Sequence, residues 1–245
     1  MISQPVRFDQ RRTPLSRRRL LLAASALLPA ACGVPGPRPQ FVTPPAGEIP
    51  IAPVRVGQRW RYQEINVYNG ARSAEISAQV VETAPQLRVR LTRSDGRAQD
   101  DEIYSAPWNV VQEPFYDITQ TFEQPLPLLP PQLSVGAQLS RSLRYRSTGA
   151  SRRLYWGDWL LARGWEQLRL PAGEFLALRI ERLINFEHQD IFRQEPRRYD
   201  TLWYAPSAGR WVQREWTGEY FMPGGRRRTP MREDWIRWEL VEYAA

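Results

Sequence analysis

Apolar and polar residues alternate with a period of two along most of the chain after residue 55. Trp60 and Tyr62, for example, are interleaved with Arg59 and Arg61, and Leu87–Leu91 alternates in the same way. This period is typical of half-buried β-strands, and no segment shows a sustained helical repeat of 3.6 residues. About ten short strands predict an all-β domain, either a single, strongly curved antiparallel sheet or a half-closed barrel.

Turn residues separate the predicted strands. Asn69 and Gly70 are typical of a tight β-hairpin. The segments Pro171–Gly173 and Ala205–Gly209 are rich in the residues that favour turns. These turns predict antiparallel neighbours along most of the chain.

The alternation stops between Phe115 and Pro131. The run Gln124–Pro131 holds four prolines and three leucines, which predicts a loop or a polyproline segment. Asp117–Glu123 is predicted to form a turn or two of helix before it. The leucines either cover the mouth of a sheet or barrel, or plug its core.

The first 31 residues have the layout of a cleaved export signal. Arg17–Arg19 precede the apolar run Leu20–Leu28, which is about half as long as a membrane-spanning helix. Paired arginines before such a run resemble the twin-arginine export motif. The alternative is the positively charged start of a general secretory signal.

Leu28–Gly33 resembles the lipobox of bacterial lipoproteins, although Pro29 takes the place of the usual aliphatic residue. Cys32 is the single cysteine of the chain, so an exported form cannot close an internal disulfide. The resemblance implies that Cys32 carries a diacylglycerol and an acylated amine, such as palmitate, which together anchor a protein stably. The alternative is an incidental cysteine that is removed with a longer signal.

The resemblance also implies a place in the cell envelope. Gly33 follows the cysteine where the inner-membrane lipoproteins of enteric bacteria carry aspartate, which favours the outer membrane, facing the periplasm. Proline and glycine dominate from Gly33 to Pro53. Residues 32–54 are therefore predicted to be the lipidated cysteine with a tether, and residues 55–245 the all-β periplasmic domain.

The formal net charge of +8 does not indicate a nucleic-acid partner. The predicted signal holds six arginines and one acidic residue, which leaves a net charge of +3 on the rest of the chain. The run Arg226–Arg228 follows Pro223–Gly225 and is predicted to be a solvated hairpin tip. The alternative is a contact with anionic headgroups.

Three motifs carry a further resemblance. Val56–Tyr62 reads Val-Gly-x-x-Trp-x-Tyr, Leu170–Phe175 contains a Pro-Ala-Gly-x-Phe turn, and Trp203–Val212 contains a Trp-Tyr-Ala-Pro-x-x-Gly turn. The chain thereby resembles families of exported bacterial β-proteins of unknown function. These motifs form turns, so the resemblance implies a fold and brings no catalytic residues with it.

The sequence offers few groups for catalysis. His188 is the single histidine, so a catalytic triad or a zinc site would depend on it alone. A carboxylate hydrolase ranks last among the predicted functions, and its candidate acids are Asp100, Asp101, Glu102, Asp158, Glu187 and Asp190. The sequence predicts a protein without catalytic residues, cofactor or metal.

Aromatic residues are the remaining candidates for a site, since the chain holds ten tryptophans. They either line a cavity for an acyl chain or a glycan, or fill the core. The predicted ligand-binding residues are Tyr155, Trp156, Trp159, Trp165, Trp203, Trp211 and Trp216.

The predicted function is the binding of an envelope lipid or glycan by a protein held at the membrane through its lipid. The alternative is a scaffold or assembly factor that binds another envelope protein through an exposed sheet edge.

Overall fold

The structure is a computed structural model, and it describes residues 40–116, 118–224 and 229–244. All of these belong to one compact unit, Gln40–Ala245. The predicted signal peptide, the predicted lipidation site Cys32 and the run Arg226–Arg228 lie outside the described residues.

The described residues are almost entirely strands and turns. A single 3-10 turn, η2 (Pro206–Ala208), lies between β11 and β12. The strands are β1 (Phe41–Val42), β2 (Arg59–Asn66), β3 (Ala71–Glu82), β4 (Leu87–Arg93), β5 (Glu102–Ala106), β6 (Asn109–Glu113), β7 (Gln120–Pro127), β8 (Gln138–Ser147), β9 (Leu154–Leu170), β10 (Gly173–Phe186), β11 (Gln194–Ala205), β12 (Arg210–Phe221), β13 (Pro230–Arg232) and β14 (Ile236–Ala244).

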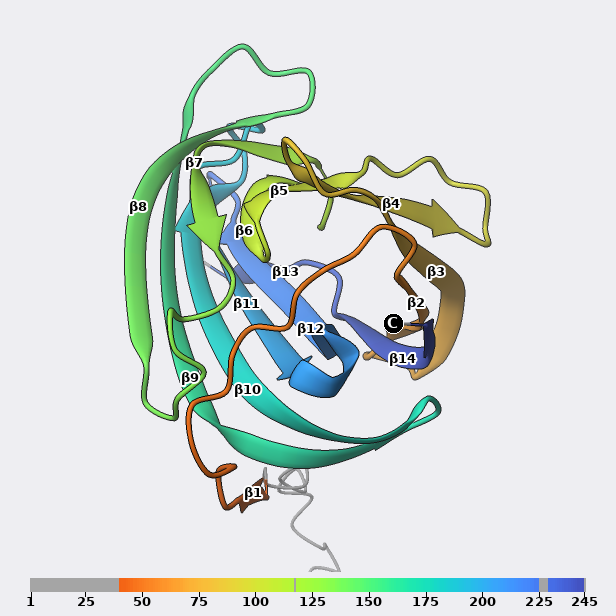
Figure 1. The fold of residues 1–245 in the computed structure, drawn as a ribbon. Helices are drawn as coiled ribbons and strands as arrows, with labels where there is room; N and C mark the ends of the chain where they lie inside the picture. Colours follow the sequence, from red (N-terminus) through yellow and green to blue (C-terminus); the bar gives the residue numbers. More distant parts are fainter. Residues whose placement is uncertain (1–39, 117, 225–228, 245) are drawn as a thin grey trace, which may run out of the picture. The chain divides into compact units, whose positions relative to one another are not determined.

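Twelve of these strands form an antiparallel barrel (Figure 1). Their order is β9-β10-β11-β12-β14-β2-β3-β4-β5-β6-β7-β8, and β8 pairs again with β9. The short strands β1 and β13 add to β9 and β12. The prediction of an antiparallel all-β barrel is confirmed, with twelve strands in the ring where about ten were expected.

The alternation seen in the sequence is the alternation between the inside and the outside of this barrel. In β4, Leu87, Val89 and Leu91 are buried, whereas Arg88 and Arg90 are exposed. Because successive side chains of a strand point to opposite faces, the buried set of each strand lines the interior.

The predicted turns join the strands as expected. Asn69 and Gly70 close the β2–β3 hairpin, and Gly70 has φ +71°. Gly209 ends the turn after Pro206–Ala208 with φ +66°. Both glycines adopt the left-handed backbone that side chains with a Cβ rarely take.

The predicted loop Gln124–Pro131 is wrong in its first half, and the predicted helix in Asp117–Glu123 is wrong from Gln120 onward, because Gln120–Pro127 forms β7. This strand pairs with β8 only from Gln120 to Phe122. Proline is tolerated further along β7, where no ladder with β8 requires its missing N–H. Leu126, Leu128 and Leu129 are buried in the core, so the leucines plug the core.

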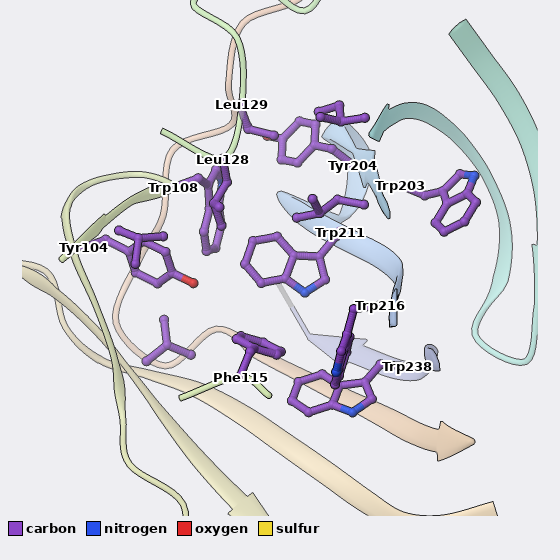
Figure 2. Close-up of a cluster of buried hydrophobic side chains, with 14 of the residues drawn as sticks. Tyr104, Trp108, Phe115, Leu128, Leu129, Trp203, Tyr204, Trp211, Trp216 and Trp238 are labelled. Atoms are coloured by element: carbon purple, nitrogen blue, oxygen red, sulfur yellow. The ribbon is translucent and has the colours of Figure 1, made fainter. Parts of the chain in front are cut away.

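One end of the barrel is filled by aromatic and aliphatic side chains, which we call the closed end. Trp108 is fully buried there and meets the rings of Trp60, Tyr104 and Trp211 edge-on, at centroid distances of 5.1–6.2 Å. Figure 2 shows Leu128 beside Trp108 in this cluster. Edge-to-face rings of this kind add stability beyond the area that they bury.

Part of the predicted tether packs on the barrel. β1 pairs with β9, and Ile49, Ile51 and Val54 pack half-buried against the core. The Ala52 N–H donates a hydrogen bond to the Tyr204 hydroxyl at 3.1 Å. Figure 1 shows this segment, in orange, crossing the barrel between β1 and β2. The compact unit therefore begins at Gln40, before the predicted boundary at residue 55.

The barrel is joined over only a short length between β7 and β8. β8 pairs with β9 from Gln138 to Tyr145, but with β7 only from Tyr145 to Ser147. Among the described residues, Gln138–Arg144 therefore have no strand partner on the β7 side. We call this segment the β8 edge.

Candidate ligand-binding cavity

A layer of buried charges lies inside the barrel. Among the described residues, Arg182, Arg198, Arg210 and Arg214 are at most 2% exposed. Each of them forms an ion pair with a carboxylate. Charges are found at such depth only when they are paired and hydrogen-bonded, because losing their hydration costs several kcal/mol per ion.

Asp200 is the centre of this layer. Its Oδ2 accepts hydrogen bonds from Arg182 Nη1 and from Arg214 Nη2, both at 2.7 Å. Asp158 completes the partners of Arg182, and Glu113 completes those of Arg214. Burial raises the pKa of Asp200, but the two guanidinium groups and their hydrogen bonds outweigh it and hold that pKa below its ordinary value.

Arg210 forms a second buried pair towards the closed end. Its Nη2 lies 2.7 Å from both carboxylate oxygens of Glu102. Its guanidinium lies 4.0 Å from the ring centroid of Trp211 and 5.2 Å from that of Trp108. The aromatic faces thus surround the cation that the carboxylate neutralises.

On the other side of this layer lies a cavity of about 730 Å³. Phe115, Tyr116, Trp216 and Trp238 contribute aromatic rings to its wall. Its rim includes residues that reach solvent, among them Arg97, whose side chain is 80% exposed. The cavity therefore opens to the outside and has the size of an ordinary small-ligand site.

Two clusters of ion-paired side chains, which come from distant parts of the sequence, line this cavity. Arg93 binds both oxygens of Glu64 at 2.8 and 2.9 Å. Glu233 binds Arg193 at 3.0 Å and Arg198 at 2.8 Å. Bidentate pairs of this kind fix the orientation of their side chains, so the cavity has a preformed polar lining.

Glu64 also accepts hydrogen bonds from Trp238 Nε1 at 3.0 Å and from the Ser73 hydroxyl at 2.8 Å. Burial raises the pKa of Glu64, but the hydrogen bonds from Arg93, Ser73 and Trp238 outweigh it and leave that pKa below its ordinary value. The carboxylate therefore stays charged at neutral pH and holds the Trp238 ring in place.

The buried charges support the floor of the cavity. The Tyr116 hydroxyl donates to Asp200 Oδ2 at 3.1 Å, and Arg198 lies 4.2 Å above the Tyr116 ring. The Arg214 guanidinium lies 3.7 Å from the centroid of Phe115. Both aromatic residues of the floor are therefore held by the charged layer behind them.

Gln99 is one of the polar residues that line the cavity. Its Nε2 donates to the Pro114 carbonyl at 3.2 Å. Its Oε1 is buried and has no hydrogen-bond partner among the described residues. Because Gln99 itself lines the cavity, a change of this side chain alters the polar lining.

Of the predicted ligand-binding residues, Trp216 lines this cavity. Tyr155 and Trp159 lie on the outer face, each 37% exposed. Trp156 is fully buried and packs against Phe122, Tyr145 and Phe186.

The other three predicted residues also lie outside the cavity lining. Trp211 belongs to the closed end, and Trp165 pairs with Val42 of β1. Trp203 donates to Glu166 Oε2 at 3.0 Å, and Figure 2 shows it apart from the other labelled rings. The structure does not gather the seven residues around one cavity, and their role in binding stays a prediction.

Five of the six candidate acids of a hydrolase are engaged with other groups; for Asp101 the backbone carbonyl accepts from Gln112 Nε2 at 3.0 Å. Glu102 and Asp158 are buried in ion pairs with arginine. Asp100 lines the cavity and accepts from the Thr119 hydroxyl at 2.7 Å. Glu187 accepts from the Tyr155 N–H, and Asp190 from the Phe192 N–H.

The described residues contain no cluster of three or more metal-ligating side chains. His188 is buried, and its Nδ1 accepts from the Asp190 N–H at 2.9 Å. In the part of the chain that the structure describes, no helix has the length and apolarity needed to cross a membrane.

We expect the free energy of unfolding to decrease as the pH falls below about 4. Asp200 and Glu64 have lowered pKa values in the folded state, and hydrogen bonds from Arg93 lower the pKa of Asp95 to about 2. In the unfolded chain these groups take up protons near pH 4. Their stabilisation is therefore complete above about pH 5 and is lost as the pH falls towards the folded-state pKa values.

Urea denaturation at pH 7, 5, 4 and 3 measures this dependence. A free energy of unfolding that stays constant or increases from pH 5 to pH 3 would contradict the charged state assigned to these carboxylates.

Comparison with known proteins gives one informative similarity. No family model matches the sequence, and no curated protein matches it. The crystal structure of a "putative lipoprotein" from Parabacteroides distasonis has a TM-score of 0.51 and 16% identity, over 79% of this chain and 98% of that one. The two proteins share a fold.

Two further crystal structures have lower scores. A "putative exported protein with YmcC-like fold" from Bacteroides fragilis has a TM-score of 0.47 and 14% identity, over 80% of this chain and 99% of that one. The "hypothetical lipoprotein YmcC" from Escherichia coli has a TM-score of 0.40 and 11% identity, over 78% and 86%.

Proposed function

We propose that this protein is a lipid-anchored, non-catalytic protein of the cell envelope that binds a glycan in the cavity. The observation that carries the proposal is the lining: aromatic rings from Phe115, Tyr116, Trp216 and Trp238 stand beside fixed polar and charged groups. Rings cover the apolar faces of sugars, and planar polar side chains bind their hydroxyl groups.

The same lining favours a glycan over an acyl chain. An acyl chain would remove water from Arg93, Glu64 and Glu233 without replacing their hydrogen bonds, which is costly. Sugar hydroxyl groups both donate and accept, so they satisfy such groups.

The charges around the cavity also favour a neutral ligand. Of the described residues that line it, Arg93, Arg97, Arg193, Arg198 and Arg232 are basic, and Glu64, Asp100, Glu233 and Asp234 are acidic. With five basic and four acidic groups the field is nearly balanced, so it attracts neither sign strongly.

Two observations support a place in the envelope. Residues 1–31 have the composition of an export signal that ends before Cys32. The fold is shared with a "putative lipoprotein". Anchoring through Cys32 in the outer membrane, facing the periplasm, is part of the proposal.

Replacement of Gln99 by leucine tests the site directly. We expect the Gln99→Leu variant to bind sugar about fivefold more weakly, because one hydrogen bond of about 1 kcal/mol is lost. A glycan array identifies the bound sugar class, and titration followed by tryptophan fluorescence gives the affinity, since Trp216 and Trp238 lie in the wall.

The matched control is Gln167→Leu, which changes an exposed glutamine outside the cavity lining and should leave the affinity unchanged. Equal binding by both variants and the wild type would overturn the assignment of the cavity. Binding of acyl chains in place of sugars would show that the site belongs to a lipid carrier.

A second candidate function is favoured by the β8 edge. Gln138–Arg144 have no strand partner on the β7 side among the described residues, and such an edge can pair with an extended segment of another envelope protein. A protein that binds no sugar on the array, but retains a partner from the envelope, would favour this scaffold function.

A further inference from the structure

A second, smaller hollow of about 190 Å³ lies beside the cavity and includes Tyr68, Tyr199 and Trp235. We call it the outer groove. Tyr68 and Tyr199 are 48% and 47% exposed. Large aromatic side chains that gather at one hollow and remain half-exposed are a common mark of a binding surface.

The outer groove is held in shape by specific contacts. The rings of Tyr68 and Trp235 meet edge-on at 5.7 Å. The Tyr68 hydroxyl donates to the Glu233 carbonyl at 3.1 Å, and Trp235 Nε1 donates to Glu215 Oε1 at 2.8 Å. A ligand therefore meets rings that are already oriented, which lowers the entropic cost of binding.

Among the described residues, the outer groove and the cavity share one lining residue. Arg232 lines both hollows. The Glu233 carboxylate binds Arg193 and Arg198 of the cavity lining, whereas its carbonyl accepts from Tyr68 of the groove. The Glu233 N–H is fixed to the Gly218 carbonyl at 2.8 Å. Glu233 thus contacts lining residues of both hollows, and its neighbour Arg232 lines both.

We infer that the ligand is an oligosaccharide chain that occupies the cavity and continues across Arg232 into the outer groove. This inference rests on the proposed function. The guanidinium of Arg232 offers donors to hydroxyl groups in either hollow. Tyr199 and Trp235 provide ring faces for sugars, while Thr217 and Glu219 in the same groove provide polar partners. A single sugar residue occupies only one of the two hollows.

The test is a length series with the full chain. The probes are N-acetylglucosamine oligomers and glucose oligomers of one to six units, titrated against the wild type, Tyr199→Ala and Gln99→Leu. Tyr199→Ala removes a half-exposed ring from the outer face and leaves the cavity lining intact. Tyr243→Ala is the control, because Tyr243 is 36% exposed and lines neither hollow.

For the wild type we expect tighter binding of the longer oligomers in one of the two series. Tyr199→Ala should lose about tenfold in affinity for the hexamer through lost ring contact and none for the dimer. Gln99→Leu should weaken all lengths to a similar degree, and Tyr243→Ala should behave as the wild type.

A hexamer that binds no tighter than the dimer, or a Tyr199→Ala variant with the wild-type length dependence, overturns the inference and leaves the cavity as a site for a short sugar. Failure of every length in both series to bind overturns the inference together with the proposed function. If a peptide binds in the outer groove and none of the sugars competes with it, the inference is also overturned.

Discussion

Replacing Asp200 with alanine should lower the free energy of unfolding by about 3–5 kcal/mol. The residue is 1% exposed, and its carboxylate neutralises both Arg182 and Arg214 in the interior of the barrel. Its removal leaves two buried guanidinium groups with one carboxylate less. It also removes the acceptor of the Tyr116 hydroxyl in the cavity floor.

Urea denaturation of Asp200→Ala and the wild type measures this loss. Glu75→Ala is the matched control, since it breaks an ion pair with Arg61 whose side chains are 44% and 47% exposed. Exposed pairs contribute at most about 1 kcal/mol. A similar small loss for both variants would mean that the charged layer inside the barrel contributes little to stability.

In the triple variant Ile49→Ser, Ile51→Ser, Val54→Ser, the free energy of unfolding should be about 3 kcal/mol lower than in the wild type. Complete burial of one such aliphatic side chain contributes roughly 1.5–3 kcal/mol, and these three are half-buried against the core. Serine has too little apolar surface to replace these contacts, so the segment that holds residues 49–54 should detach from the core.

Denaturation of the full chain again provides the measurement. Val56→Ser is the control, because Val56 is 61% exposed in the same part of the chain. If the triple variant were as stable as the control, residues 40–54 would act as a tether alone and not as part of the folded unit.

The class of fold could be predicted because it depends on local patterns. The alternation in Leu87–Arg93 and the turn at Asn69–Gly70 are visible in a few residues. Closure of the ring could not be predicted from local patterns, because it depends on the pairing of β14 with β2, which lies near the opposite end of the described chain. The prolines of Gln120–Pro127 concealed β7, whose ladder with β8 ends before Pro125.

The cavity was predictable only in part. Arg182 stands between Ile180 and Ile184 on the buried face of its strand, and Glu64 follows Trp60 and Tyr62 at the same spacing. A charge at an apolar position is a signal that the sequence does contain. Which partner it meets is decided by distant strands, as with Glu64 and Arg93.

The closing pair of strands has a consequence for how the protein reaches its native state. Apart from β12–β14 and β14–β2, every pair in the ring joins strands that are neighbours in sequence, and contacts between sequence neighbours form early. The two pairs that β14 forms, with β12 and with β2, must both wait for Ile236–Ala244. Until then β2 keeps an unpaired edge, through which incomplete chains can associate. Chains in which β14 is not yet in place should therefore associate more readily than the closed barrel.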